Sequence, residues 1–146
     1  MQTLLFLCTG NYYRSRFAEI FFNRLADSAN LDWIADSRGV SVDKGNKNVG
    51  PISKHAVDGL KTCGIRIEGE IRFPLQARAE DFQHASLVIA LKEAEHRRVI
   101  AQRFPEWEDK VEYWHIHDVD QASAEIALGE IQILVKALIE RLKRAR

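Results

Sequence analysis

The chain has 146 residues, enough for one sizeable core and short for two, so we expect a single domain over residues 1–146. Lysine plus arginine and aspartate plus glutamate balance at 21 each, which argues against a protein that binds nucleic acid or an anionic membrane. With two cysteines, no apolar run of transmembrane length and no recognisable export leader, the sequence predicts a cytoplasmic protein with reduced thiols.

The N-terminal segment predicts a strand, a loop and a helix in direct succession. Residues 3–8 (TLLFLC) form a continuous apolar run, which is typical of a strand buried on both faces of a parallel sheet. Thr9 and Gly10 then signal a turn. From Ser15 to Ala29 the apolar residues recur at helical spacing, so the loop leads into an amphipathic helix.

The middle of the chain predicts a second strand and a second helix. Residues 33–37 favour a strand that stops near Gly39, and residues 43–50 favour an exposed loop. Ser53 is a suitable N-cap for a helix that reaches about Cys63, where Gly64 gives a stop signal. Residues 65–75 fit no single element.

The remaining sequence continues the alternation of strands and helices. We predict a helical turn at 80–82, strands at 86–91 and 111–117, and helices at 92–103 and 123–144. The last helix carries an apolar stripe of Ile126, Ile131, Leu134, Leu138 and Leu142. Such alternation implies a parallel sheet covered by helices on both faces, with ligands bound at the carboxyl ends of the strands.

The loop after the first strand carries the residues for phosphate chemistry. A loop from Cys8 to Ser15 can turn its backbone N–H groups inward, and the following helix N-terminus adds positive potential, so together they can hold an anion. We predict that the whole run takes part in phosphate binding: Thr9, Gly10, Asn11, Tyr12, Tyr13, Arg14 and Ser15. Gly10 supplies unusual backbone freedom, and Asn11 and Ser15 organise the loop.

Two side chains of this loop have catalytic roles in the prediction. The planar guanidinium of Arg14 can form paired hydrogen bonds to phosphate oxygens and stabilise them in the transition state. The same positive surroundings favour the thiolate of Cys8, which is the nucleophilic form. Cys8 alone would be interpreted as an ordinary core cysteine, and Arg14 alone as a solvated charge. Their spacing across a strand-to-helix turn points to a phosphatase.

The run CTGNYYRS, followed by Ala18 and Glu19, resembles the signature of the low-molecular-weight protein tyrosine phosphatases. Weaker similarity extends to residues 36–39, 87–95 and 114–118. The resemblance implies a flavodoxin-like α/β fold, a three-layer sandwich with a four-stranded parallel sheet. It also implies hydrolysis of phosphotyrosine in proteins or of small aryl phosphates through a phosphocysteine on Cys8, without metal or cofactor, in a monomer or weak dimer.

The same resemblance identifies Asp118 as the general acid, although the family usually has Asp-Pro followed by an aromatic residue, whereas this chain has Asp118, Val119 and Asp120. Asp120 is therefore an alternative acid. Tyr13 stands where the family often has a second, protective cysteine, so we expect no redox guard in the loop. Arg16 replaces a common proline and could face the substrate, and Tyr12 could form one wall of an aromatic slot.

Three other functions stay open from the sequence. Arsenate reductases resemble this family, but they need a resolving pair of cysteines, and Cys63 is the only other cysteine here. His115 and His117 share one face of a predicted strand and could bind a metal beside the aspartates, although His-X-His is a weak motif. A phosphate- or phosphotyrosine-binding module with weak or no turnover would keep Cys8 and Arg14 and lack efficient acid catalysis.

Overall fold

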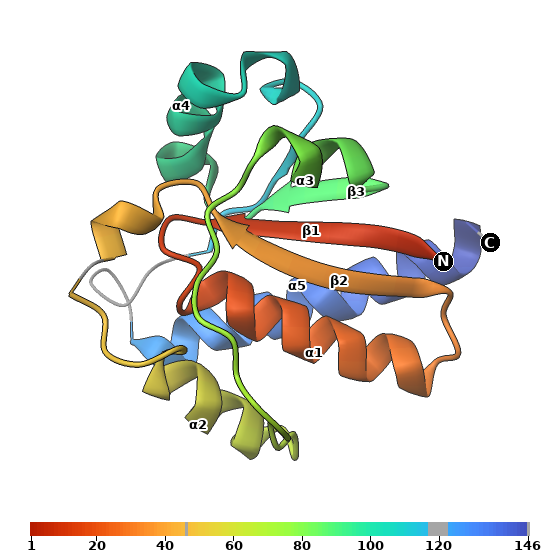
Figure 1. Ribbon diagram of the computed structural model, residues 1–146. Helices are drawn as coiled ribbons and strands as arrows, with labels where there is room; N and C mark the ends of the chain where they lie inside the picture. Colours follow the sequence, from red (N-terminus) through yellow and green to blue (C-terminus); the bar gives the residue numbers. More distant parts are fainter. Residues whose placement is uncertain (46, 117–122, 146) are drawn as a thin grey trace.

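A computed structural model describes residues 1–45, 47–116 and 123–145, and it shows a parallel sheet between two layers of helices (Figure 1). The strands are β1 (Gln2–Cys8), β2 (Trp33–Gly39), β3 (Leu87–Ala90) and β4 (Glu112–Tyr113). The α-helices are α1 (Arg14–Ser28), α2 (Lys54–Thr62), α3 (Ala79–His84), α4 (Glu93–Arg103) and α5 (Ala124–Ala145). Short 3₁₀ turns lie at Val42–Gly45 and Pro105–Trp107.

The strands lie in the order β2-β1-β3-β4, and every neighbouring pair is parallel. The predicted α/β fold with a four-stranded parallel sheet is therefore confirmed. Because β1 lies between β2 and β3, the connections leaving β1 and β2 run to opposite sides of it. The carboxyl end of β1 is thus the switch point at which ligands bind in such sheets.

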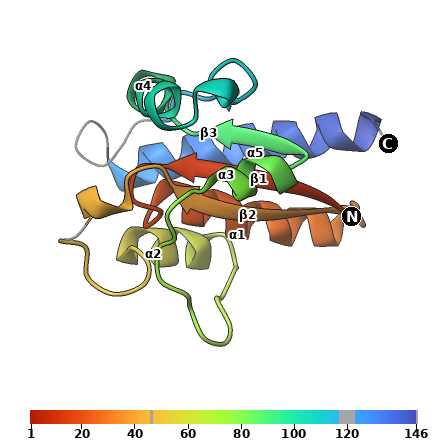
Figure 2. The ribbon, with the colours of Figure 1, turned by 45° about the horizontal axis from the view of Figure 1, so that its top comes forward.

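Each face of the sheet packs against its own helices. Side chains such as Phe6 and Ile89 point toward α1, α2 and α5, where Phe17, Phe22 and Ile131 complete the core. The alternate strand side chains, Leu5, Leu7 and Val88, point to the other face. There α3 and α4 cover them with Phe82 and Ile100. Figure 1 shows α3 and α4 on one side of the strands and α1, α2 and α5 on the other, and in Figure 2 α4 lies above the strands and α1 below them. Burial on both faces explains why residues 3–8 are continuously apolar.

Two predicted elements differ in detail. The described part of the strand predicted at 111–117 forms a strand only at Glu112–Tyr113. This strand, β4, is at the edge of the sheet, and its neighbour β3 has four residues. The chain nevertheless continues beside β3, because the amide of Trp114 donates to Ala90 O at 2.8 Å and that of Ile116 to Leu91 O at 2.8 Å.

The apolar stripe of the last helix was wrong at its first member. Ile126 is 59% exposed. The buried face of α5 contains the predicted Ile131 and Leu138 together with Ala127 and Val135. Those four positions are spaced by three or four residues, whereas Ile126 lies about 100° around the helix from Ala127. None of the helices in the described ranges combines the length and apolar character that a membrane crossing needs.

Candidate active site

The loop between β1 and α1 lies against the end of β2, and Gly39 makes this approach possible. A Cβ at Gly39 would be 2.6 Å from Thr9 O and 3.0 Å from the Asn11 nitrogen, so a larger residue would displace the loop. The next two amides hold it in place: Val40 N donates to Cys8 O at 2.9 Å, and Ser41 N to Thr9 O at 3.0 Å. In the sequence Gly39 signals the end of a strand, and its close contact with the loop appears only in the structure.

The left-handed residue of the loop is Asn11, with a φ of 52°, whereas Gly10 has no positive φ. The prediction that Gly10 supplies the unusual backbone conformation was therefore wrong. A Cβ at Gly10 would also find only ordinary contact, 3.6 Å from Asn48 Nδ2. Asparagine tolerates the left-handed region better than other residues with a side chain, which suits Asn11 to this position.

The buried side chain of Asn11 ties the loop to three other segments. Its Nδ2 donates to Ser15 Oγ and to Ser37 Oγ, both at 2.9 Å. Its Oδ1 accepts from Arg72 Nη1 at 2.9 Å and from the Leu75 amide at 3.0 Å. All the hydrogen-bonding capacity of the amide is therefore used, and the shape of the loop is fixed by residues far away in the sequence.

Cys8 and Ser15, at the two ends of the loop, are in direct contact. Cys8 Sγ lies 2.8 Å from Ser15 Oγ, and both residues are buried. In the part of the chain that the structure describes, the backbone amides of residues 9 to 12 have no hydrogen-bond acceptor. These amides follow directly on the cysteine and precede α1, which is the arrangement that an anion site needs.

Arg14 is paired with a carboxylate that the sequence analysis did not identify. Its Nη1 lies 3.2 Å from Glu95 Oε2, and its Nη2 lies 3.1 Å from Glu95 Oε1. Thr9, from the same loop, donates its hydroxyl to the Glu95 carboxylate. Hydrogen bonding from His96, and then from Arg14 and Thr9, lowers the pKa of Glu95 far below its ordinary value, although burial opposes this. Glu95 is therefore a fixed anion.

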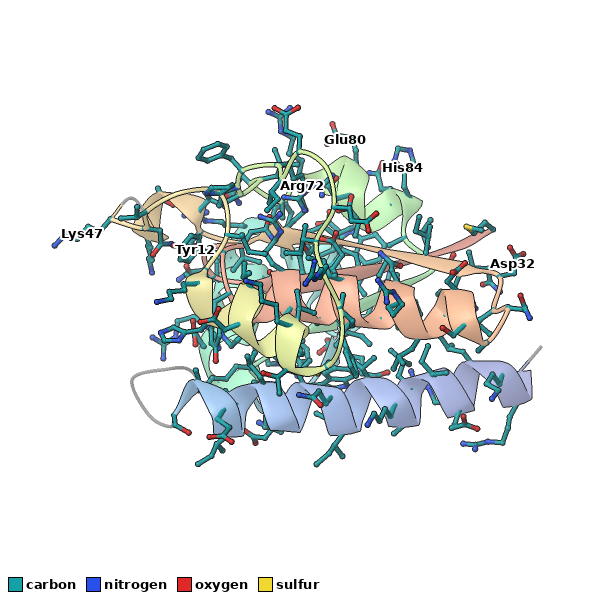
Figure 3. The ribbon with its side chains drawn as sticks, turned by 90° about the horizontal axis from the view of Figure 1, so that it is seen from below. Tyr12, Asp32, Lys47, Arg72, Glu80 and His84 are labelled. Atoms are coloured by element: carbon teal, nitrogen blue, oxygen red, sulfur yellow. The ribbon has the colours of Figure 1, made fainter. Side chains whose placement is uncertain are left out.

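A second cluster that sequence reasoning missed supports the other side of the loop. Ser37 donates its hydroxyl to Glu19 Oε1 at 2.5 Å, and Arg72 reaches the same oxygen at 3.3 Å. Burial raises the pKa of Glu19, while the bond from Ser37 and the charge of Arg72 lower it. Arg72 lies in the long segment between α2 and α3 that crosses the sheet edge (Figures 1 and 3), so one guanidinium fastens this segment to the loop.

The two tyrosines of the loop point to different surroundings. Tyr12 donates its hydroxyl to Val49 O at 2.5 Å, and Tyr12 O accepts from the Ser53 amide at 2.9 Å. Figure 3 places Tyr12 at the same end of the molecule as Lys47 and opposite Asp32. Tyr13 instead directs its hydroxyl to Ala124 O, 3.3 Å away at the start of α5. Only Tyr12 is thus positioned near the rim of the loop.

Arg16 lies in the protein interior and is bonded to the segment that leads to α2. Arg16 is only 3% exposed, and its Nη1 donates to Pro51 O at 2.9 Å. Burial is the main cause that lowers its pKa, followed by repulsion from Arg72. Arg16 therefore anchors the segment leading to α2 beneath the loop.

The residues considered for acid catalysis and for metal binding are only partly described. Asp118, Asp120 and His117 lie outside the described residues. His115 is 73% exposed in its side chain, and its Nε2 lies 3.6 Å from Glu93 Oε1. Within the described ranges, no three histidine, cysteine or acidic side chains gather closely enough to hold a metal ion.

Comparisons with known proteins agree with this geometry. Residues 3–144 match the family model "Low molecular weight phosphotyrosine protein phosphatase". The protein-arginine-phosphatase of Bacillus subtilis (strain 168) is 32% identical over 108 residues, which are 74% of this chain and 67% of that protein. The low molecular weight protein tyrosine phosphatase of T. tengcongensis superposes with a TM-score of 0.81 and 30% identity, covering 97% of this chain and 99% of that one.

A further solved structure is of YwlE arginine phosphatase, as a cysteine-to-serine mutant with a phosphorylated active-site serine. It superposes with a TM-score of 0.80 at 27% identity, covering 99% of this chain and 98% of that one.

Proposed function

We propose a mechanism for this chain, which belongs to the low molecular weight phosphotyrosine protein phosphatase family. The Cys8 thiolate attacks phosphorus, so that a sulfur–phosphorus bond forms while the bond to the ester oxygen breaks. Asp118 gives its proton to the departing oxygen. Water then attacks the phosphocysteine, Asp118 takes up a proton from that water, and inorganic phosphate and the Cys8 thiolate are released.

The observation that carries this proposal is the arrangement of the loop around Cys8. The sulfur contacts Ser15, the amides of residues 9 to 12 have no acceptor in the described structure, and Arg14 follows at the start of α1. A dianionic phosphate fits such a ring of donors. In the transition state the negative charge is spread over three equatorial oxygens, where fixed amides and a guanidinium can stabilise it.

Asp118 is proposed as the acid on the family resemblance and on the path of the chain. Ile116, two residues earlier, is bonded to Leu91 O just after β3, which is the strand next to β1. The chain therefore reaches residue 116 at the sheet edge where Cys8 lies. Asp120 stays the alternative acid, since both carboxylates follow at short distance along the sequence.

For the substrate we propose phosphotyrosine in a protein or a small aryl phosphate. The family description and the place of Tyr12 at the loop rim support this choice, because an aromatic wall can pack against a phenyl ester. Phosphoarginine in proteins is a second candidate, and the similarity to the Bacillus subtilis protein-arginine-phosphatase supports it. The cleaved bond would then join phosphorus to nitrogen, with the same attack by Cys8.

An arsenate-reductase activity has less support. Cys63 lies just after α2, at the opposite end from the N-cap Ser53, whose amide donates to Tyr12 O. It is the only cysteine besides Cys8, whereas such reductases need a resolving pair. We further propose one domain over residues 1–146 that acts as a monomer or weak dimer. We place it in the cytoplasm, since two free thiols suit a reducing compartment.

Steady-state hydrolysis tests the proposal. Wild-type protein should hydrolyse a phosphotyrosine peptide well above a matched phosphoserine peptide, and Cys8→Ser should abolish turnover while the protein stays folded. Phosphoarginine peptide in the same assay decides between the two substrate classes. A wild type that binds phosphate without any Cys8-dependent turnover would show a binding module, and inhibition by chelators would show metal-dependent hydrolysis.

A further inference from the structure

Glu95 binds Arg14 through the two terminal nitrogens of its guanidinium, Nη1 and Nη2. The two terminal nitrogens of Arg14 face the two carboxylate oxygens at 3.1 and 3.2 Å, which is a bidentate, end-on pair. The side chain of Arg14 is 8% exposed and that of Glu95 is 30% exposed. A paired contact to a phosphate uses another edge, formed by Nε and one terminal nitrogen. End-on pairing therefore orients the guanidinium and is compatible with a phosphate contact.

The Glu95 carboxylate is itself fixed from two sides besides Arg14. The Thr9 hydroxyl donates to Oε1, and His96 Nε2 lies 3.2 Å from Thr9 Oγ1 and 3.5 Å from Glu95 Oε1. The His96 ring is completely buried, and its Nδ1 accepts from the Lys92 amide at 3.1 Å. An accepting Nδ1 leaves the proton of the neutral ring on Nε2, pointing toward Thr9 and Glu95.

These contacts give Glu95 two effects on the phosphate-binding loop, residues 8–15. An anchored carboxylate cannot swing away when phosphate arrives, so it keeps Arg14 in one orientation through the reaction. Its charge also offsets part of the Arg14 charge, which weakens the attraction for any anion bound in the phosphate-binding loop. The first effect supports the rate of the chemical step, and the second weakens binding of substrate and product phosphate.

We propose that Glu95, anchored by Thr9 and His96, is a positioning residue for Arg14 that raises the rate of phosphoryl transfer at the expense of phosphate affinity. This inference rests on the proposed function of Cys8 and Arg14. It predicts opposite changes in two measurable quantities, whereas a residue that merely supports the fold would lower both.

The test is Glu95→Gln, which keeps the shape of the side chain and removes its charge. We expect kcat for an aryl phosphate to fall between about tenfold and a hundredfold, because Arg14 is less well oriented. We expect the inhibition constant of inorganic phosphate to decrease, because the charge that offsets Arg14 is removed. Glu93→Gln is the matched control: Glu93 is on the same helix turn, pairs with Arg97 at 2.8 Å, and its replacement should change neither quantity.

A second pair of variants covers the case in which Glu95→Gln does not fold. Thr9→Val removes one anchor of the carboxylate and leaves its charge, so kcat should fall without any gain in phosphate affinity; Thr9→Ser should restore kcat. A kcat unchanged in Glu95→Gln, or a loss of phosphate affinity as large as the loss of kcat, would overturn the proposal.

Phosphate binding separates this inference from the proposed function. Calorimetric titration of inorganic phosphate into Cys8→Ser and into the Cys8→Ser, Glu95→Gln double variant needs no turnover. Tighter binding by the double variant supports the charge-offset effect even if the wild type fails to show Cys8-dependent hydrolysis. Equal or weaker binding by the double variant contradicts it whatever the hydrolysis assay gives.

Discussion

The sulfur of Cys8 lies 2.8 Å from the hydroxyl oxygen of Ser15, and that oxygen also accepts a hydrogen bond from Asn11 Nδ2. A thiolate has no proton to donate, so with Cys8 ionised the Ser15 hydroxyl donates to the sulfur. The same bond assists the departure of the thiolate from phosphocysteine. The bond from Asn11 holds the Ser15 oxygen in place beside the sulfur.

Ser15→Ala should slow the reaction of Cys8. A hydrogen bond to a charged group contributes about 1.5–3 kcal/mol, so we expect roughly a tenfold to hundredfold loss in kcat. Alkylation of Cys8 by iodoacetate at neutral pH, followed by mass spectrometry, should slow in parallel. Ser86→Ala, which alters an exposed serine beside Thr3 at the other end of β1, is the control. Unchanged alkylation in Ser15→Ala would show that the contact has no effect on the thiolate.

Asn11→Ala should destabilise the protein by two separable contributions. It leaves the buried partners of the amide unsatisfied, at about 1–3 kcal/mol, and it places alanine, which tolerates the left-handed region less well than asparagine, at a φ of 52°. Asn11→Gly loses the same hydrogen bonds without the left-handed penalty of about 1–2 kcal/mol. Urea unfolding should therefore find the glycine variant more stable than the alanine variant. Equal free energies of unfolding would mean that the loop relaxes out of this conformation.

Asp118→Asn should slow poor leaving groups far more than good ones. An aryl phosphate with an acidic phenol leaves without help, whereas an alkyl-like ester needs a proton on the departing oxygen. Rates measured over a series of phenols should thus depend more steeply on the phenol pKa in the variant than in the wild type. If Asp120→Asn steepens that dependence and Asp118→Asn does not, Asp120 is the acid.

Stability should fall as the pH decreases from 7 to 5 because of His96. Burial is the main cause that lowers the pKa of His96, followed in the same direction by Arg14 and Lys92, while Glu95 opposes them. The unfolded chain then binds this proton more readily, so the free energy of unfolding decreases below pH of about 6.5, by at most about 1.4 kcal/mol per pH unit. Above that pH the stabilisation is complete.

The variant His96→Asn isolates this effect. It keeps an acceptor for the Lys92 amide and removes the titrating ring, so its stability should depend less on pH between 5 and 7. The raised pKa of Glu19 acts in the opposite direction, losing stability as the pH rises, but it is common to both proteins and cancels in their difference. An identical pH dependence in the two proteins would show that His96 does not titrate differently on folding.

The sequence predicted those parts of the site whose signals are local. The apolar run ending at Cys8, the helical spacing after Ser15 and the cap at Ser53 each depend on neighbouring residues, and the structure contains all three elements. Gly10 was misassigned because glycine is the usual residue at positive φ, whereas the buried hydrogen bonds of Asn11 stabilise it there.

The supporting residues could not be predicted in the same way. Glu95 lies 81 positions from Arg14 and Arg72 lies 61 positions from Asn11, and each looks like an ordinary surface charge in its own segment. The need for glycine at position 39 appears only once β2 passes beside the loop. Such pairs depend on strand order, which brings β1, β2 and β3 together at one edge.

The most direct test of the mechanism is to trap the phosphoenzyme. Wild-type protein mixed with excess aryl phosphate and quenched in acid within the first turnover should carry one phosphoryl group, which peptide mapping should find on Cys8. Phosphate on another residue, or full turnover by Cys8→Ser with no trapped intermediate, would contradict attack by this sulfur.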